Sequence, residues 1–269
     1  MNKVTTIVNY CTNDYQYLKK VVDSVLDFSE EVLIPVCDHF FDGKEENNGL
    51  LEKTFSEVDA KFLLWRFDPI IAKSAPIRYW NNLARKVAFD NRSIDTDFLL
   101  FLDADEIVDT DRFTEFFDSS ICNAVDAMLL GQYFYFREPI YRAKTWEDIA
   151  LLVRTSCVTE ESIMQDAGNL SERHAIWARS PRRANMILGL DNKPMVHHYS
   201  WARTYKQMLR KVQSWSHSED RDWETMVHEE FSRPFNGTDF VHGYEYDIVG
   251  NQFDIRLEDT DSDALEKCS

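Results

Sequence analysis

Short apolar runs and helix-like spacings of apolar residues alternate along the first half of the chain. Runs rich in β-branched or large apolar residues predict strands at residues 4–10, 31–36, 62–65, 97–102 and 127–136. Between the first two runs, a helix is predicted from apolar residues at helical spacing: Leu18, Val21, Val22, Val25 and Leu26. Residues 75–89 and 112–117 are predicted to be helical as well. This alternation predicts an α/β fold, in which helices flank a mostly parallel sheet.

The second half of the chain has a less regular pattern. Residues 195–199 resemble a strand, and residues 202–215 have the apolar stripe of a helix. The last dozen residues are acidic and poor in large apolar side chains, so we expect a disordered tail at 258–269. Since no repeat or Pro/Gly/Ser linker divides the remainder, we predict one domain over residues 1–257, with a C-terminal helical extension.

Composition narrows the functional classes. The 269 residues are 44% hydrophobic, which is enough for a sizeable core, and their formal net charge of -17 argues against a nucleic-acid partner. The N-terminus lacks the features of a signal peptide, and no apolar stretch is long enough for a transmembrane segment. Five cysteines without a CxxC pair suggest neither disulfides nor a zinc site. We therefore expect a soluble, cytoplasmic protein.

The segment FLLFLDADEIVD, which ends in an acidic cluster, carries the strongest chemical signal. Asp103 and Asp105 directly follow five consecutive apolar residues of a predicted buried strand. Ligands of open α/β folds bind at the carboxyl ends of such strands, and two carboxylates there can converge on one Mg²⁺ or Mn²⁺. The alternative is a solvated acidic loop, because short acidic triplets are common. A calcium EF-hand loop is excluded, since its further ligands and its glycine are missing.

The strand order, the helix before the motif and the sequence FLDADE resemble the GT-A glycosyltransferases, especially the family-2-like group. The resemblance covers residues 1–140 well and the rest loosely. It implies a GT-A, Rossmann-like fold with a nucleotide-sugar-binding half at 1–140 and an acceptor-side half at 141–257. By the same resemblance, Mn²⁺ or Mg²⁺ binds Asp105, while Asp103 contacts the donor ribose or the metal and its waters. The donor would be a nucleotide-diphosphate sugar, with a UDP-sugar favoured.

Further donor-binding positions follow from the same resemblance. They lie at the ends of the first two strands and in the helix before the acidic motif: Tyr10, Thr12, Asp38 and Arg85. The family pattern after the second strand is Asp-Asp-Gly-Ser, whereas this chain has Cys-Asp-His-Phe, which leaves the base open. Lys211 is predicted to receive the donor diphosphate, with an anionic acceptor as the other candidate, because four cations within nine positions stand out in an acidic chain. An ordinary solvated helix face is the alternative.

Two adjacent histidines occupy the strand predicted at 195–199. Successive side chains of a strand point to opposite faces, so only one of His197 and His198 can reach a given site. The resemblance implies that a histidine from this region joins the metal ligands, and we favour His198. A core histidine with one hydrogen bond is the alternative for either residue.

An inverting transfer needs a carboxylate that takes the proton of the acceptor hydroxyl. The resemblance favours the acidic pair in TWEDIALLVR, and Asp148 is our first choice, with Asp166 and Glu172 as competitors. Tyr135 and Trp146 are predicted to line the groove for a glycan or glycolipid acceptor. The Q-x-x-R-W motif of processive synthases is absent, so a single addition is expected.

Two rival functions share the predicted fold. A sugar nucleotidyltransferase usually has a Gly-rich phosphate loop after its first strand, but the first glycine of this chain is Gly43. A non-catalytic carbohydrate-binding protein would tolerate loss of the acidic residues, all of which are in place. The sequence thus favours a metal-dependent glycosyltransferase.

Overall fold

The computed structural model describes residues 2–73, 75–165, 172–214 and 221–259. Its strands are β1 (Val4–Asn9), β2 (Ser29–Cys37), β3 (Lys61–Trp65), β4 (Phe98–Asp103), β5 (Glu106–Val108), β6 (Ala127–Phe136), β7 (Tyr141–Arg154), β8 (Arg183–Ile187), β9 (Val196–Trp201) and β10 (Tyr246–Ile248). Its helices are α1 (Tyr15–Val25), α2 (Asn48–Glu57), α3 (Ile77–Asp90), α4 (Thr110–Phe117), α5 (Glu160–Met164), α6 (Glu172–Arg179), α7 (Tyr205–Ser214) and α8 (Trp223–Phe231).

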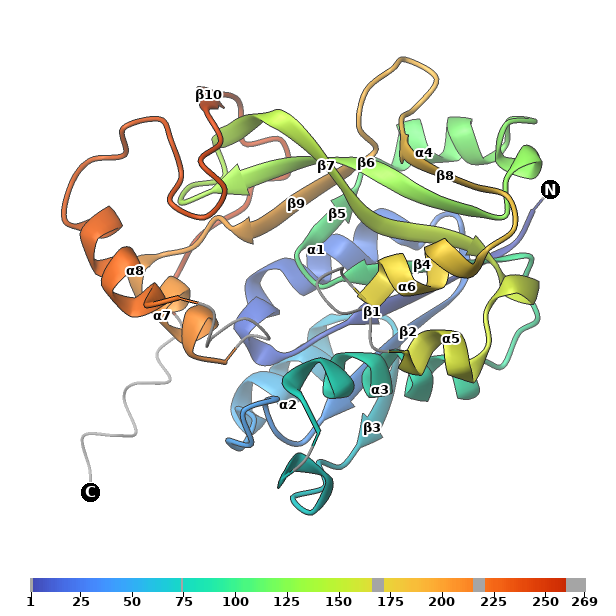
Figure 1. Ribbon diagram of the computed structural model, residues 1–269, viewed down its shortest axis with the longest axis horizontal. Coiled ribbons are helices and arrows are strands. Elements are labelled where there is room, and N and C mark those ends of the chain that lie inside the picture. Colours follow the sequence, from blue (N-terminus) through green and yellow to red (C-terminus); the bar gives the residue numbers. More distant parts are fainter. Residues whose placement is uncertain (1, 74, 166–171, 215–220, 260–269) are drawn as a thin grey trace.

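In the described residues, all these strands belong to one sheet with the order β3-β2-β1-β4-β7-β6-β9-β5, while β8 and β10 pair with β6 and β7. The first four strands of this order are parallel to one another. From β7 onward the sheet is mixed, since β6 and β7 form a long antiparallel pair and β9 runs parallel to β6. Figure 1 shows helices on both sides of this sheet.

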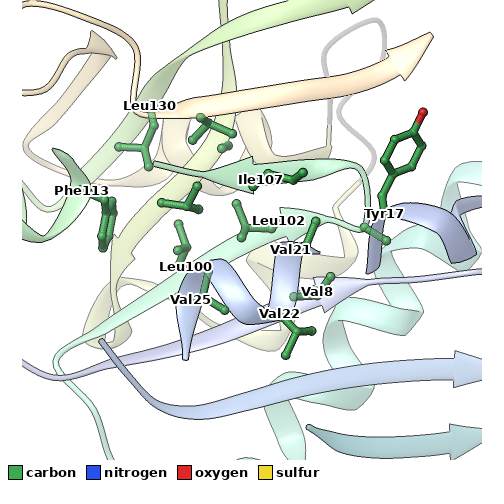
Figure 2. Packing of buried hydrophobic residues seen from close by; sticks show 14 of the residues in the cluster. Val8, Tyr17, Val21, Val22, Val25, Leu100, Leu102, Ile107, Phe113 and Leu130 are labelled. Carbon is green, nitrogen blue, oxygen red and sulfur yellow. The ribbon is translucent and has the colours of Figure 1, made fainter. Parts of the chain in front are cut away.

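The central strand β4 is buried on both faces, which explains its unbroken apolar run. Leu100 and Leu102 point into a core cluster that includes Val21 of α1 and Phe113 of α4. Figure 2 shows this cluster between α1 and the sheet. Leu99 and Phe101, which alternate with these residues along β4, point to the opposite face of the sheet, into a second cluster with residues from α3, α5 and α6.

A third apolar cluster anchors the C-terminal helices to the far part of the sheet. Trp201 at the end of β9 packs with Met208 of α7 and with Trp223 and Val227 of α8. Their burial fixes α7 against the end of β9, close to the carboxyl end of β1. The apolar stripe of α7 thereby decides where its polar residues point.

The predicted α/β class and mostly parallel sheet flanked by helices are confirmed. Each predicted strand coincides with an observed one to within a few residues. The pattern missed the long strand β7, whose polar residues hide its alternation, and it missed α2. Residue 215 of the helix predicted at 202–215 and residues 260–269 of the predicted tail lie outside the described residues, and the one-domain boundary at 257 stays a prediction.

No helix in the described parts of the chain has the length and apolar character that crossing a bilayer requires.

Replacing Leu100 by alanine should cost about 2–5 kcal/mol of unfolding free energy, because its side chain is fully buried and the cavity would remain. Urea denaturation followed by circular dichroism measures this loss. The matched control is Leu64→Ala on edge strand β3, where the side chain is 69% exposed and the change should be within ~0.5 kcal/mol. Equal losses in the two variants would contradict the described core.

Candidate functional site

A cleft of about 290 Å³ opens at the carboxyl ends of β1 and β4. The register of the two strands pairs Asn9 with Asp103, so the ends of both strands lie side by side. Both predicted acids line the cleft, together with residues from the segment between β1 and α1 and from α3, α6, α7 and β9. The site therefore combines segments from both halves of the chain.

The acidic motif forms a tight turn between β4 and β5. The backbone N–H of Asp103 donates to the Glu106 carboxylate at 2.9 Å, and the N–H of Ala104 donates to the carbonyl of Asn9 at 3.0 Å. The Asp105 carbonyl accepts from Tyr199 of β9 at 2.8 Å. These bonds hold the turn at both ends, which aims the Asp103 and Asp105 side chains into the cleft.

Asp103 is held by two arginines. Nη2 of Arg85 lies 3.0 Å from one of its carboxylate oxygens, and Nη2 of Arg173 lies 3.1 Å from the other. Burial alone would raise the pKa of this carboxyl, but Arg173 and Arg85 outweigh it and lower the pKa below its usual value. Asp103 is therefore ionised and already paired in the described structure.

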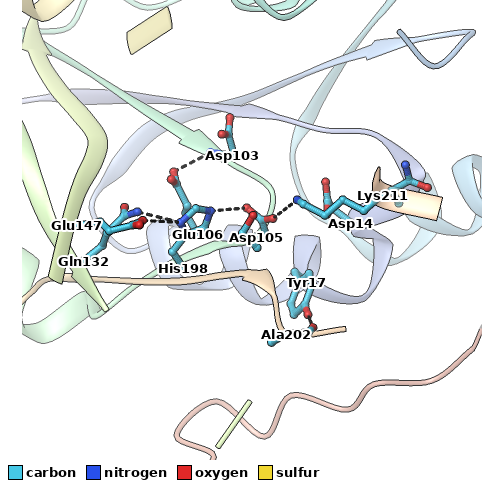
Figure 3. Close-up of polar contacts among 12 residues, drawn as sticks. Asp14, Tyr17, Asp103, Asp105, Glu106, Gln132, Glu147, His198, Ala202 and Lys211 are labelled. Atoms are coloured by element: carbon cyan, nitrogen blue, oxygen red, sulfur yellow. Dashed lines mark hydrogen bonds and ion pairs between the residues drawn. The ribbon is translucent and has the colours of Figure 1, made fainter. Parts of the chain in front are cut away.

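Asp105 is surrounded by three cationic groups. Its Oδ1 lies 3.5 Å from Nε2 of His198, and its Oδ2 lies 3.7 Å from Nζ of Lys211 (Figure 3). Nη2 of Arg203 lies 3.2 Å from the same Oδ2. Burial opposes ionisation, but Lys211, His198 and Arg203 together hold the pKa of Asp105 well below its usual range. A buried carboxylate at this position is stable only because these cations face it.

His198 is oriented by side chains behind it. Its Nδ1 lies 2.9 Å from Nε2 of Gln132 and 3.8 Å from the Glu147 carboxylate, so its Nε2 faces Asp105 (Figure 3). Burial would lower the pKa of His198, but the contacts with Asp105 and Glu147 raise it to about 10. His197 points to the other face, as strand alternation predicts, where burial lowers its pKa to about 3.

Within the described residues, no group of three His, Cys, Asp or Glu side chains is arranged to hold a metal ion. Asp105 and His198 nevertheless face each other, and they offer one carboxylate and, once His198 releases its proton to make room for the cation, one imidazole. Mg²⁺ and Mn²⁺ commonly take one or two carboxylates and complete their coordination with substrate phosphates and water. The donor set therefore fits a cation whose remaining ligands come from a phosphorylated substrate.

The predicted donor-binding residues are only partly brought together. Tyr10, Arg85 and Lys211 line the cleft with the acidic motif. Thr12 is buried beside it, and its backbone N–H donates to the Glu46 carboxylate at 3.1 Å. Asp38 does not line the cleft, because its Oδ1 accepts from the backbone N–H of Phe67 at 2.8 Å. We correct the assignment of Asp38 as a base-binding residue accordingly.

A smaller pocket adjoins the cleft at the ends of β2 and β3. It shares Tyr10, Cys11, Asn13 and Ser214 with the cleft. Its other walls are mostly apolar or aromatic and include Pro35, Cys37, His39, Phe40, Phe41, Trp65 and Ala84. Sequence reasoning missed this pocket, since Phe40 and Phe41 lie in a loop without a periodic pattern and Trp65 comes from the end of a different segment, β3. The free volume of the pocket is about 30 Å³, close to that of one water molecule, so a flat aromatic ring could enter it only if the surrounding side chains moved apart.

The residue predicted first as the catalytic base is elsewhere. Asp148 accepts a hydrogen bond from the backbone N–H of Met186 at 3.1 Å and does not line the cleft. Since residues 141–154 form a strand, adjacent side chains alternate, and Glu147 rather than Asp148 faces His198. The choice of Asp148 is thus corrected.

The two predicted acceptor residues also lie away from the cleft. Tyr135 is buried and stacks on Tyr199 with ring centroids 4.2 Å apart, while its hydroxyl lies 2.8 Å from Nδ1 of His197. Trp146 is 38% exposed and packs edge-on against Tyr133. Both belong to faces of β6 and β7 that turn away from the acidic motif, so neither lines an acceptor groove there.

The remaining base candidates have different outcomes. Asp166 lies outside the described residues. Glu172, at the start of α6, lines the cleft, and its carboxylate lies 3.9 Å from Nη1 of Arg85. Asp14 and Arg173 also line the cleft and were missed, because each stands in a segment without any recognisable motif.

Comparisons with known proteins do not assign a family. No protein-family model and no curated protein matches the chain. A TarS fragment from S. aureus, solved with UDP-GlcNAc, is 15% identical with a TM-score of 0.45, over 86% of this chain and 73% of that one.

Two further solved structures have similarly weak likenesses. The glycosyltransferase GlyE of Streptococcus pneumoniae is 14% identical with a TM-score of 0.42, over 86% of this chain and 64% of that one. A 4-diphosphocytidyl-2C-methyl-D-erythritol synthase from Anaerococcus prevotii is 7% identical with a TM-score of 0.47, over 71% and 91%. Likenesses this low leave function to be argued from the site itself.

Replacing Arg173 by leucine should destabilise the protein by about 3–5 kcal/mol, because the fully buried Glu106 would lose its charge partner, now 2.9 Å away. Adding Glu106→Gln, which keeps an acceptor for the Asp103 N–H, should recover more than half of that loss. Urea denaturation of both single variants and the double variant measures the coupling. Strictly additive losses would refute the charge compensation described here.

Proposed function

We propose that this protein is a GT-A-type glycosyltransferase, which transfers a sugar from a nucleotide-diphosphate sugar to a hydroxyl of its acceptor. One observation carries the proposal: Asp103 and Asp105, at the carboxyl end of the central strand, share a single cleft with Arg85, Arg173 and Lys211. Binding a complex of a metal ion and a diphosphate needs both carboxylates, which suit a divalent cation, and cationic side chains, which suit phosphates.

The electrostatics of the cleft support a donor that arrives with a divalent cation. The described lining residues include four carboxylates, on Asp14, Asp103, Asp105 and Glu172, and four cationic side chains, on Arg85, Arg173, His198 and Lys211. A bare diphosphate would therefore add negative charge to a site whose own charges already cancel. A divalent ion that binds with the diphosphate offsets this added charge, so metal and nucleotide should bind together.

Mn²⁺ or Mg²⁺ would be held by Asp105 and His198, with Asp103 beside them. When bound, such an ion neutralises negative charge that develops on the departing diphosphate. Arg85, Arg173 and Lys211 bind and orient the phosphates from the surrounding walls. The smaller apolar pocket accommodates the nucleobase once its side chains move apart to enlarge it. UDP is the favoured nucleotide.

We assign the role of catalytic general base to Glu172, which takes the proton of the acceptor hydroxyl as that oxygen attacks the anomeric carbon. Two observations support this role: Glu172 lines the cleft, and Arg85 at 3.9 Å holds its carboxylate near the acidic motif. A base on the face opposite the leaving diphosphate gives inversion at the anomeric carbon. A glycan or glycolipid hydroxyl is the proposed acceptor, with one sugar added per binding event.

Nucleotide binding should depend on metal. UDP with Mn²⁺ should raise the melting temperature by several degrees, whereas UDP with EDTA should not, because only the complete metal diphosphate balances the cleft charge. Differential scanning fluorimetry with UDP, GDP, CDP and dTDP tests this. Equal, metal-independent shifts for all four nucleotides would remove the donor site. In a hydrolysis assay with the matching nucleotide sugar, release of a nucleoside diphosphate supports transfer. Release of pyrophosphate from a nucleoside triphosphate and a sugar 1-phosphate, in a separate assay, would instead indicate a nucleotidyltransferase.

Glu172→Gln should lower turnover by roughly 100-fold or more and change the donor KM by less than about threefold, since a lost general base acts on the chemical step. The matched control is Asp148→Asn, which keeps an acceptor for the Met186 N–H and should leave turnover within about threefold. Steady-state kinetics with donor and acceptor measures both. Full activity of Glu172→Gln, with loss in Asp148→Asn, would return the role to Asp148.

A further inference from the structure

Two cations share one oxygen of Asp105, and they are held in very different ways. Arg203 is fixed by several partners: Nε donates to the carbonyl of Ser200 at 2.7 Å, Nη1 donates to the carbonyl of Asn13 at 2.8 Å, and Nη2 also contacts Asp14. Its side chain is fully buried. Arg203 is therefore a permanent counter-ion of Asp105.

Lys211 reaches the same oxygen from the cleft. Its ammonium lies 3.7 Å from Oδ2 of Asp105, its side chain is 14% exposed, and its Nζ lies 5.9 Å from the ring centre of Trp201. It lines the cleft, whereas Arg203 does not. A lysine ammonium is a point charge on a flexible four-carbon stem, so it can exchange one anionic partner for another without moving the helix.

This position conflicts with a divalent cation on Asp105. An ammonium and a doubly charged ion on one carboxylate repel each other strongly in a poorly hydrated site. Lys211 must leave Asp105 when the cation binds, and the nearest new anion in the same cleft would be the diphosphate that arrives with the metal. The ammonium of Lys211 would then pair with the phosphate oxygens.

We propose that Lys211 is an exchangeable counter-ion, which occupies Asp105 in the ligand-free protein and passes to the donor diphosphate when a divalent cation takes its place. The inference rests on the proposed function and adds a regulatory consequence. Lys211 weakens metal binding when no nucleotide is present and strengthens nucleotide binding when metal is present. It thus makes the two ligands bind cooperatively, and the coupling is the same in both directions.

The test is Lys211→Met, which keeps the length and apolar stem of the side chain. Mn²⁺ alone should bind this variant at least about fivefold more tightly than the wild type, and UDP in saturating Mn²⁺ should bind at least about fivefold more weakly. Titration of the electron paramagnetic resonance signal of free Mn²⁺ gives the first affinity, and isothermal calorimetry gives the second. Neither readout needs catalysis.

The matched control is Lys20→Met on α1, an exposed lysine whose loss changes the net charge equally; both of its affinities should stay at wild-type values. A melting curve of each variant verifies folding. Equal or weaker Mn²⁺ binding by Lys211→Met, including no measurable binding by either protein, overturns the inference. Failure of the wild type to bind UDP with Mn²⁺ counts instead against the proposed UDP site, while the comparison with Mn²⁺ alone still decides the role of Lys211.

Discussion

The site depends on charge compensation around a buried carboxylate. Asp105 can remain ionised in the interior only because Arg203, Lys211 and His198 face it at 3.2 to 3.7 Å. Removing a carboxylate from water costs several kcal/mol, which only close and well-hydrogen-bonded cations offset. Each of these cations comes from the second half of the chain, whereas the carboxylate follows the central strand of the first half.

The same constraint explains how the fold is joined. Arg173 in α6 pairs with Glu106 and Asp103, and β5 pairs with β9, which brings His198 opposite Glu106. The acidic turn is thus held in place by Arg173 and Arg203, which follow it in the sequence by about seventy to one hundred residues. The turn is therefore pre-organised: these contacts fix its conformation before any ligand binds.

The sequence predicted those features that depend on the regular spacing or continuity of apolar residues within one helix or strand. The unbroken apolar run before Asp103 predicted a buried strand, and the alternation of His197 and His198 predicted that only one of the two histidines reaches the cleft. Position along one element can be derived from its own residues in this way.

Contacts between elements that lie far apart in the sequence could not be derived from the pattern of residues in either element. Asp148 lies outside the cleft, whereas Glu172 lines it. The sequence did not predict this, because residues 141–154 form one strand whose many polar residues mask the alternation of its two faces. Arg173 gave no local signal, since an arginine that pairs across seventy residues looks like any surface arginine in the sequence. Arg203 stood out as one of four cations within nine positions, but that spacing did not predict its contact with Asp105. The apolar pocket at Phe40 and Trp65 likewise combines a loop after β2 with the end of β3, and only the sheet brings these two segments together.

The central claim is that the acidic cleft holds a metal nucleoside diphosphate, and a crystal structure with UDP and Mn²⁺ tests it most directly. The account predicts an anomalous Mn²⁺ peak that contacts Asp105, His198 and the diphosphate, with the uracil ring in the adjoining apolar pocket. A nucleotide bound elsewhere, or a Mn²⁺ peak outside this cleft, would contradict the account.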